Sequence, residues 1–136
     1  MRHDIPKKVY NLTMKAFVSR ERPLHWVGSS KKDLLSFPAD VVDDIGYALG
    51  VVQCGGKPPS AKPWKGEGPG VFEIVEDFRG DTYRVAYLVR FAQAVYVLHS
   101  FQKKSPSGIR TARVDEELIH ERLKLALADC EARYGK

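Results

Sequence analysis

The residues best suited to chemistry in this sequence are cations near the ends of strand-like segments. They are Arg79, Arg84, Arg90, Lys103 and Lys104. Guanidinium and ammonium groups that gather at the rim of a sheet are suited to binding phosphate oxygens. The same side chains would also suit an ordinary solvated rim. The sequence therefore leaves a phosphate site and a plain surface as alternatives.

Motifs of the common hydrolases and nucleotide-binding enzymes do not occur in the sequence. It holds no G-x-S-x-G elbow, no H-E-x-x-H pair, no P-loop and no G-x-G-x-x-G segment. Cys54 and Cys130 share no C-x-x-C spacing with each other or with a histidine. We therefore expect two ordinary reduced thiols, no metal site and no cofactor.

Length and charge favour one small domain with a polyanionic partner. The chain has 136 residues, of which 43% are hydrophobic, and its formal net charge is +5. A chain of this size buries enough surface to fold without disulfide or metal staples. Positive charge gathers in residues 1–22, which we expect to form a basic and mobile arm ahead of a folded domain at 23–136.

Hydropathy gives no reason to place the chain in a membrane. No apolar run approaches the roughly 18 residues that a membrane-spanning helix needs. The first residues are basic but lack the apolar stretch of a signal peptide. We expect a soluble, cytoplasmic protein with no membrane partner.

Apolar periodicity and breaker residues predict a small α+β fold. Its expected architecture is an N-terminal strand and two helices, then an antiparallel sheet of three to four strands and a C-terminal helix. The expected elements are a strand at 24–27, helices at 31–37 and 38–54, a Pro- and Gly-rich loop at 57–70, strands at 71–77, 82–90 and 94–101, and a helix at 115–134.

The hairpins between the expected strands decide which side chains share a face of the sheet. We expect Asp77 to pair with Thr82 and Arg90 to pair with Ala94, so that side chains alternate between two faces. The apolar face is expected to pack on the helices and the mixed face to be the working face. The expected core face holds Phe72, Ile74, Val85, Tyr87, Val89, Val95, Val97, His99 and Phe101. The expected working face holds Glu73, Val75, Thr82, Arg84, Ala86, Leu88, Arg90, Tyr96, Leu98 and Ser100.

Three segments of this region carry a family resemblance. They are Phe72-Glu-Ile-Val, Thr82-Tyr-Arg84-Val-Ala-Tyr and Val95-Tyr-Val-Leu-His-Ser-Phe-Gln-Lys103-Lys-Ser-Pro. Together they resemble the RelE/ParE toxin superfamily, in its HigB-like, phage Gp49-related branch, over about residues 24–134. The resemblance implies a RelE-like fold and a toxin of a type II toxin–antitoxin module. It further implies a ribosome-dependent, metal-independent mRNA endonuclease, held inactive by a cognate antitoxin, expected to be a helix-turn-helix protein.

The resemblance also assigns roles to the cations. Arg84 matches the family's strand arginine, which implies phosphate binding and transition-state stabilisation. Lys103 and Lys104 match the basic pair after the last strand, and at least one of them is expected beside Arg84. The alternative for Arg84 is an ion pair with Glu73 or Asp77.

Further residues complete the expected site. His99 is either a catalytic acid or base or a buried, hydrogen-bonded histidine, because a shift of strand register decides which face it occupies. Glu73 is the one carboxylate on the expected working face, and the general base stays open. Expected RNA contacts are Lys62, Lys65, Arg79, Arg90, Tyr96, Arg110 and Arg113, with Tyr96 stacking on a base.

Two other functions remain open at this level. A ParE-like protein would disable DNA gyrase by binding and would leave RNA intact. A non-toxic binding module on the same scaffold would do neither. The cationic working face argues only modestly against the gyrase-binding alternative.

Overall fold

The computed structural model describes residues 21–90, 93–103 and 109–135, with the side chains of 109–112 excepted. The expected basic arm therefore lies almost wholly outside the described residues, and so does Lys104. The described part has the α+β fold that the sequence predicts.

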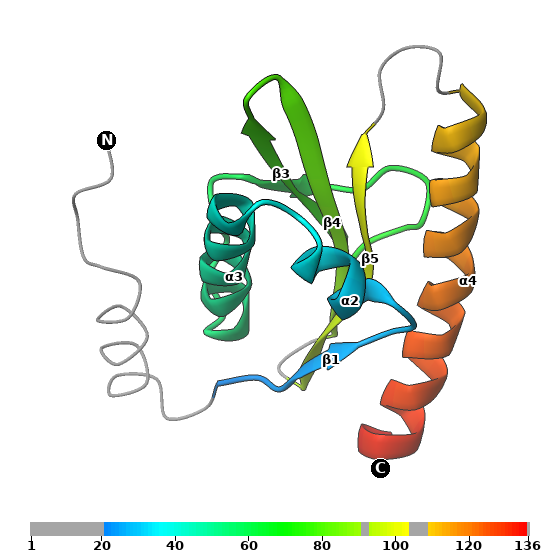
Figure 1. Cartoon of the computed structure of the whole chain (residues 1–136). Coiled ribbons are helices and arrows are strands. Elements are labelled where there is room, and N and C mark those ends of the chain that lie inside the picture. Colours follow the sequence, from blue (N-terminus) through cyan, green and yellow to red (C-terminus); the bar gives the residue numbers. More distant parts are fainter. Residues whose placement is uncertain (1–20, 91–92, 104–108, 136) are drawn as a thin grey trace.

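A five-stranded sheet forms the centre of the molecule (Figure 1). Its strand order is β1-β5-β4-β3-β2, with antiparallel pairing throughout except that β1 runs parallel to β5. The sheet is thus larger than expected and mixed in direction. Its strands are β1 (Leu24–Trp26), β2 (Ala61–Pro63), β3 (Val71–Phe78), β4 (Asp81–Arg90) and β5 (Ala94–Lys103).

The short strand β2 lies inside the segment that we expected to be a loop throughout. Lys62 of β2 pairs with Glu73 of β3. Pro63 is tolerated here because β2 is the edge strand, so the missing N–H of proline costs no internal ladder bond. The expectation of an uninterrupted loop at 57–70 was wrong at these positions.

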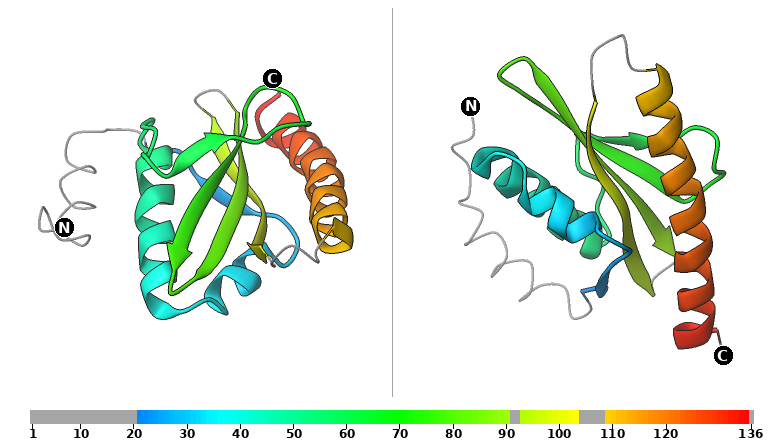
Figure 2. Two further views of the ribbon diagram at one scale, coloured as in Figure 1. Left: turned by 90° about the horizontal axis from the view of Figure 1, so that it is seen from above. Right: turned by 45° about the vertical axis from the view of Figure 1, so that its right-hand side comes forward.

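Helices cover both faces of the sheet, as the left view of Figure 2 shows. One face carries α2 (Ser30–Leu35) and α3 (Ala39–Gln53), and the other carries α4 (Ile109–Tyr134). The helix α4 begins six residues before the expected start, at Ile109 rather than at Asp115, because residues 109–114 contain neither Gly nor Pro. Its first turn therefore holds no acidic residue, and the expected match of acids to the helix dipole does not apply.

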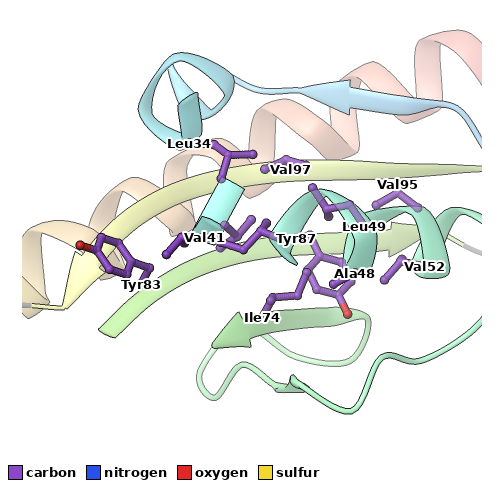
Figure 3. Packing of buried hydrophobic residues seen from close by; sticks show 12 residues of the cluster. Leu34, Val41, Ala48, Leu49, Val52, Ile74, Tyr83, Tyr87, Val95 and Val97 are labelled. Atoms are coloured by element: carbon purple, nitrogen blue, oxygen red, sulfur yellow. The ribbon is translucent and has the colours of Figure 1, made fainter. Parts of the chain in front are cut away.

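The face under α3 is an apolar core (Figure 3). Ile45 and Leu49 of α3 pack with Val85 and Tyr87 of β4, and all four are almost fully buried. Each buried aliphatic side chain of this size contributes about 1.5–3 kcal/mol of transfer free energy. Burial also raises the pKa of the Tyr87 hydroxyl to about 12.

A β-bulge in β5 changes the side-chain pattern that the hairpins predict. The expected pairs of Asp77 with Thr82 and of Arg90 with Ala94 are confirmed. Between them, Tyr87 pairs with Val97 but Ala86 pairs with His99, which makes Leu98 the additional residue. Side chains of β5 beyond Leu98 therefore lie on the opposite face from the one that simple alternation gives.

The bulge corrects three of our face assignments. His99 and Phe101, expected on the core face, lie on the face of Arg84 under α4. Ser100, expected on the working face, is buried on the other side, where its hydroxyl donates a hydrogen bond to the carbonyl oxygen of Ser30 at 2.9 Å. Such an insertion leaves no local trace in an alternating apolar run.

Candidate functional site

Buried polar side chains mark the face of the sheet under α4. Arg84 of β4 and Glu73 of β3 are diagonal neighbours across the two strands. Arg84 Nη1 donates to Glu73 Oε1 at 2.8 Å, and the two side chains are 17% and 8% exposed. This is the ion pair that the sequence left as the alternative for Arg84. The working face is thus covered and paired, where we expected it to be open.

The ion pair uses only part of the hydrogen-bonding capacity of Arg84. Its Nε is buried and has no hydrogen-bond partner among the described residues. An unsatisfied buried donor on a cation is costly, and native structures keep few of them. Arg84 therefore keeps one donor that none of the described residues satisfies.

Exposed lysines lie on either side of this pair. Lys103 of β5 pairs with Thr82, which puts it diagonally across from Arg84 on the same face. Lys62 of β2 lies directly across from Glu73. Both lysines are exposed. The expected neighbourhood of Arg84 and Lys103 is thus confirmed by the register, whereas Lys104 lies outside the described residues.

His99 is held between the sheet and α4. Its Nε2 lies 2.8 Å from Asp115 Oδ1, and its Nδ1 lies 3.4 Å from Arg122 Nη1. Arginine can only donate, so the network assigns Nδ1 as the acceptor and places the proton on Nε2, which donates to Asp115. Both ring nitrogens are engaged and the residue is 5% exposed. This arrangement is the buried histidine that the sequence left as an alternative to a catalytic one.

Arg122 and Asp115 are residues that the sequence reasoning missed. Besides His99, Arg122 donates to the carbonyl oxygen of Leu98 and to Ser29 Oγ, both at 3.1 Å. Asp115 and Arg122 are seven residues apart, which places them on the same side of α4 as buried Ile119. A helical projection of the sequence would therefore have shown both residues facing the sheet.

The loop before α2 has to make room for Arg122. Gly28 has a φ of 58°, and a Cβ at this position would lie 2.8 Å from Arg122 Nε. Only glycine combines that backbone conformation with the close approach of the guanidinium group. The position of Arg122 therefore depends on glycine at position 28 as well as on its place in α4.

Three further expected RNA contacts are exposed. Lys65 and Arg113 are exposed. Arg79, in the turn between β3 and β4, is exposed with its guanidinium 5.1 Å from the ring centre of Phe78. Arg90 is half-buried at the opposite end of β4 from the turn that holds Arg79, and the side chain of Arg110 lies outside what the structure describes.

Tyr96 is not available to stack on a base, and that expectation was wrong. It is 1% exposed, and its hydroxyl donates to Asp129 Oδ2 at 2.6 Å. Burial and this hydrogen bond raise the pKa of Tyr96 well above its ordinary value. In turn, the hydrogen bonds from Tyr96 and Arg133 lower the pKa of Asp129. Tyr96 therefore fastens the last turns of α4 to the sheet.

A histidine supports the same end of α4. His25 Nε2 lies 2.9 Å from the hydroxyl of Tyr134, and its ring lies 4.8 Å from that of Tyr96. These contacts hold the C-terminal turns of α4 against β1 and β5. They lie at the opposite end of α4 from Asp115, so they are separate from the site around Arg84.

Neither a membrane-spanning helix nor a metal site is found among the described residues. None of the helices in 21–90, 93–103 and 109–135 is both long and apolar enough to cross a membrane. Within the same described part of the chain, no group of three or more His, Cys, Asp or Glu side chains is placed to hold a metal ion.

Comparison with known proteins identifies the family. Residues 32–124, which include Glu73, Arg84, His99 and Arg122, match the model of the phage-derived protein Gp49-like family (DUF891). No curated protein matches the chain significantly, and no solved structure does. The family belongs to the RelE/HigB-like toxin group and is associated with the toxins of toxin–antitoxin modules, which implies an antitoxin partner. Because the match covers more than half of its length, the chain belongs to the Gp49-like family.

Proposed function

We propose that this chain is a type II toxin that cuts mRNA on the ribosome, without a metal ion, and thereby inhibits translation in the cytoplasm. Membership of the Gp49-like family supports the toxin assignment. The formal net charge of +5 and the exposed lysines around Arg84 support a polyanionic substrate. The partners are the ribosome with its mRNA and a cognate antitoxin of the helix-turn-helix type.

Metal-free cleavage of RNA sets three tasks for the site. The 2′-hydroxyl loses its proton and its oxygen bonds to the adjacent phosphorus, the phosphorane charge is stabilised, and the bond to the 5′-oxygen breaks as that oxygen gains a proton. In our proposal Glu73 accepts the first proton and Arg84 stabilises the phosphorane. The ammonium group of Lys103 gives a proton to the leaving oxygen, and Lys104 adds positive charge.

The remaining cations have simpler roles in the proposal. Lys62, Lys65, Arg79, Arg90, Arg110 and Arg113 are proposed contacts to RNA phosphates. His99 keeps β5 and α4 together beneath the site and takes no part in proton transfer, because both of its nitrogens are engaged.

One observation carries the proposal most directly: the Glu73–Arg84 pair lies buried beside the exposed Lys103. A buried ion pair contributes little to stability, and apolar residues of the same volume often serve as well. A carboxylate, a guanidinium group with a spare donor and an ammonium group on one face also match the three tasks of RNA cleavage. A role in RNA cleavage therefore explains the presence of the Glu73–Arg84 ion pair better than a contribution to stability does.

Expression in cells, with the 5′ ends of cellular mRNA mapped, tests the proposal. The wild type should arrest translation and create new ends in phase with codons. Arg84→Ala, and the double change Lys103→Ala with Lys104→Ala, should remove those ends while the variants stay folded. Lys32→Ala, an exposed lysine of α2 on the opposite side of the sheet, is the matched control and should leave them unchanged.

Three other outcomes would refute the proposal or the site that it assigns. Arrest of replication with intact mRNA would support the ParE-like alternative that disables gyrase. Normal growth at full expression would support a non-toxic binding module. Full toxicity of the Arg84→Ala variant would refute the assigned site even if mRNA were cut.

A further inference from the structure

Trp64 is an aromatic side chain that the proposed reaction does not use. It follows β2 directly, and its backbone N–H donates to the carbonyl oxygen of Val71 at 2.9 Å, which closes the segment 64–70 into a loop. Figure 1 shows this loop passing from the edge of the sheet towards α4. Its far side is held there by Glu67, whose Oε1 lies 3.1 Å from Nδ1 of His120.

The ring of Trp64 belongs to an aromatic series on the face of Arg84. Its centre lies 6.3 Å from that of Phe101, with the two rings perpendicular. Phe101 in turn stacks on His99 with ring centres 4.8 Å apart and an angle of 12° between the planes. Because His99 is fixed by Asp115 and Arg122, Phe101 is supported from behind. The series is therefore a rigid platform whose outer member is Trp64.

This platform adjoins the group that is proposed to bind the scissile phosphate. Phe101 pairs directly with Arg84 across β4 and β5, so their Cα atoms lie about 4.5–5.5 Å apart. Phe101 thus neighbours both Trp64 and Arg84. A nucleotide whose phosphate binds at Arg84 would extend its base across Phe101 towards the indole ring.

The surroundings of Trp64 favour a nucleic acid over an apolar partner. Its ring is only partly buried, while the flanking Lys62 and Lys65 are exposed cations. In the loop, Gly66 and Gly68 have positive φ, and a Cβ at either would meet nothing within 4 Å. An aromatic ring between lysines is the arrangement that binds single-stranded nucleic acid by stacking and charge together.

From this juxtaposition we propose that Trp64 is the stacking platform for an unpaired nucleobase next to the scissile phosphate. The inference rests on the proposed RNA cleavage and adds the residue that grips the base. Stacking accepts any base, because every base has a π-face, so Trp64 supplies affinity and alignment. Hydrogen-bonding readout of the base identity is not part of this role.

Fluorescence of the purified chain tests the proposal without catalysis. The variant Trp26→Phe leaves Trp64 as the only tryptophan and is the parent for all measurements. The probe is a short single-stranded oligonucleotide that is 2′-O-methylated throughout and therefore cannot be cut. Binding should quench the emission of Trp64, and a matched probe with abasic sites should not quench it.

Three substitutions in this parent separate stacking from charge. Trp64→Ala should weaken binding roughly 10- to 100-fold, as measured by anisotropy of a labelled probe, whereas Trp64→Phe should restore most of the affinity. Lys65→Ala is the control for charge and should lower the slope of log affinity against log salt by about one, which Trp64→Ala should leave unchanged.

Two results would overturn the stacking role. One is equal affinity of the Trp64→Ala variant and the parent, and the other is unchanged Trp64 emission up to millimolar probe. Either result leaves mRNA cleavage on the ribosome to be judged by its own experiment, so the two proposals fail separately. Circular dichroism of the Trp64→Phe and Trp64→Ala variants verifies that both stay folded.

Discussion

The two faces of the sheet differ in what they bury. The face under α3 buries aliphatic side chains such as Ile45 and Val85, with no charged group among the residues of that cluster. The face under α4 buries Glu73, His99 and Asp115 and covers most of Arg84. The two helices thus rest on surfaces of opposite chemical character.

This difference indicates how stability and function are divided in the molecule. Apolar burial stabilises the fold in proportion to the area removed from water. Buried charges cost desolvation energy, which their mutual attraction only partly returns. Real proteins depart from an apolar interior mainly at functional sites. The face that buries charged side chains is therefore the better candidate for the functional face. Substitutions at four places in the molecule test whether the two faces differ in this way.

The largest effect on stability should come from the apolar face. Ile45→Ala removes a fully buried side chain beneath the sheet and should lower the free energy of unfolding by about 2–5 kcal/mol. Urea denaturation followed by circular dichroism measures it. Leu35→Ala, at a side chain that is 60% exposed, is the control and should stay within about 0.5 kcal/mol of the wild type. Equal losses of unfolding free energy in both variants would contradict the stabilising role of the face under α3.

The ion pair under α4 should respond differently to single and double replacement. Glu73→Leu leaves the guanidinium group of Arg84 covered without its partner and should cost about 3 kcal/mol. Adding Arg84→Met should return the stability to within about 1 kcal/mol of the wild type. Urea denaturation of both variants completes the comparison. A double variant as unstable as the single one would mean that the pair is structural.

The histidine network should show a smaller loss with a spectroscopic signature. Asp115→Ala leaves the Nε2–H group of His99 buried without an acceptor and should cost about 1–3 kcal/mol. Nitrogen NMR shifts of the imidazole ring should report the Nε2–H tautomer in the wild type and a mixture of tautomers in the variant. The same single tautomer in both proteins would show that Asp115 does not set it.

The smallest effect should come from the far end of α4 and depend on pH. Hydrogen bonds from Tyr96 and Arg133 lower the pKa of Asp129 below its ordinary value of 3.8. A lowered folded-state pKa gives stability that is present above the unfolded value and lost as pH falls through the folded one. Because the side chain is 39% exposed, Asp129→Asn should cost at most about 1 kcal/mol at pH 6.

Thermal denaturation at several pH values measures that loss. The difference in melting temperature between wild type and Asp129→Asn should shrink steadily below pH 4 and vanish once the wild-type carboxyl is protonated. Arg79→Gln, in an exposed turn with no part in this contact, is the control. A difference that does not change with pH would exclude the charge of Asp129 as its cause.

Much of the fold follows from local patterns. Alternation along β3 and β4, together with the pairs of Asp77 with Thr82 and of Arg90 with Ala94, places Glu73 and Arg84 on one face from the sequence alone. The apolar spacing of Ile45, Leu49 and Val52 likewise predicts a helix over this segment, and all three side chains are buried in α3. These patterns are set by the helical and strand periods, which sequence records directly.

The rest depends on contacts between distant segments. The bulge at Leu98 moves His99 to the face of Arg84, and nothing in the neighbouring residues marks it. The contact of Arg122 with His99 joins residues far apart in sequence, so no local spacing predicts it. The covering of the working face by α4 also depends on packing, which explains why Tyr96 was wrongly expected to be accessible.

Cleavage of mRNA on reconstituted ribosomes by the Glu73→Leu, Arg84→Met double variant separates the role of the ion pair in catalysis from its role in stability. Purified wild-type chain should cut the mRNA in translating ribosomes and leave a 2′,3′-cyclic phosphate. The Glu73→Leu, Arg84→Met variant should cut at least about 10²–10³-fold more slowly at unchanged stability. Cleavage by this variant at the wild-type rate would show that Glu73 and Arg84 take no part in the reaction.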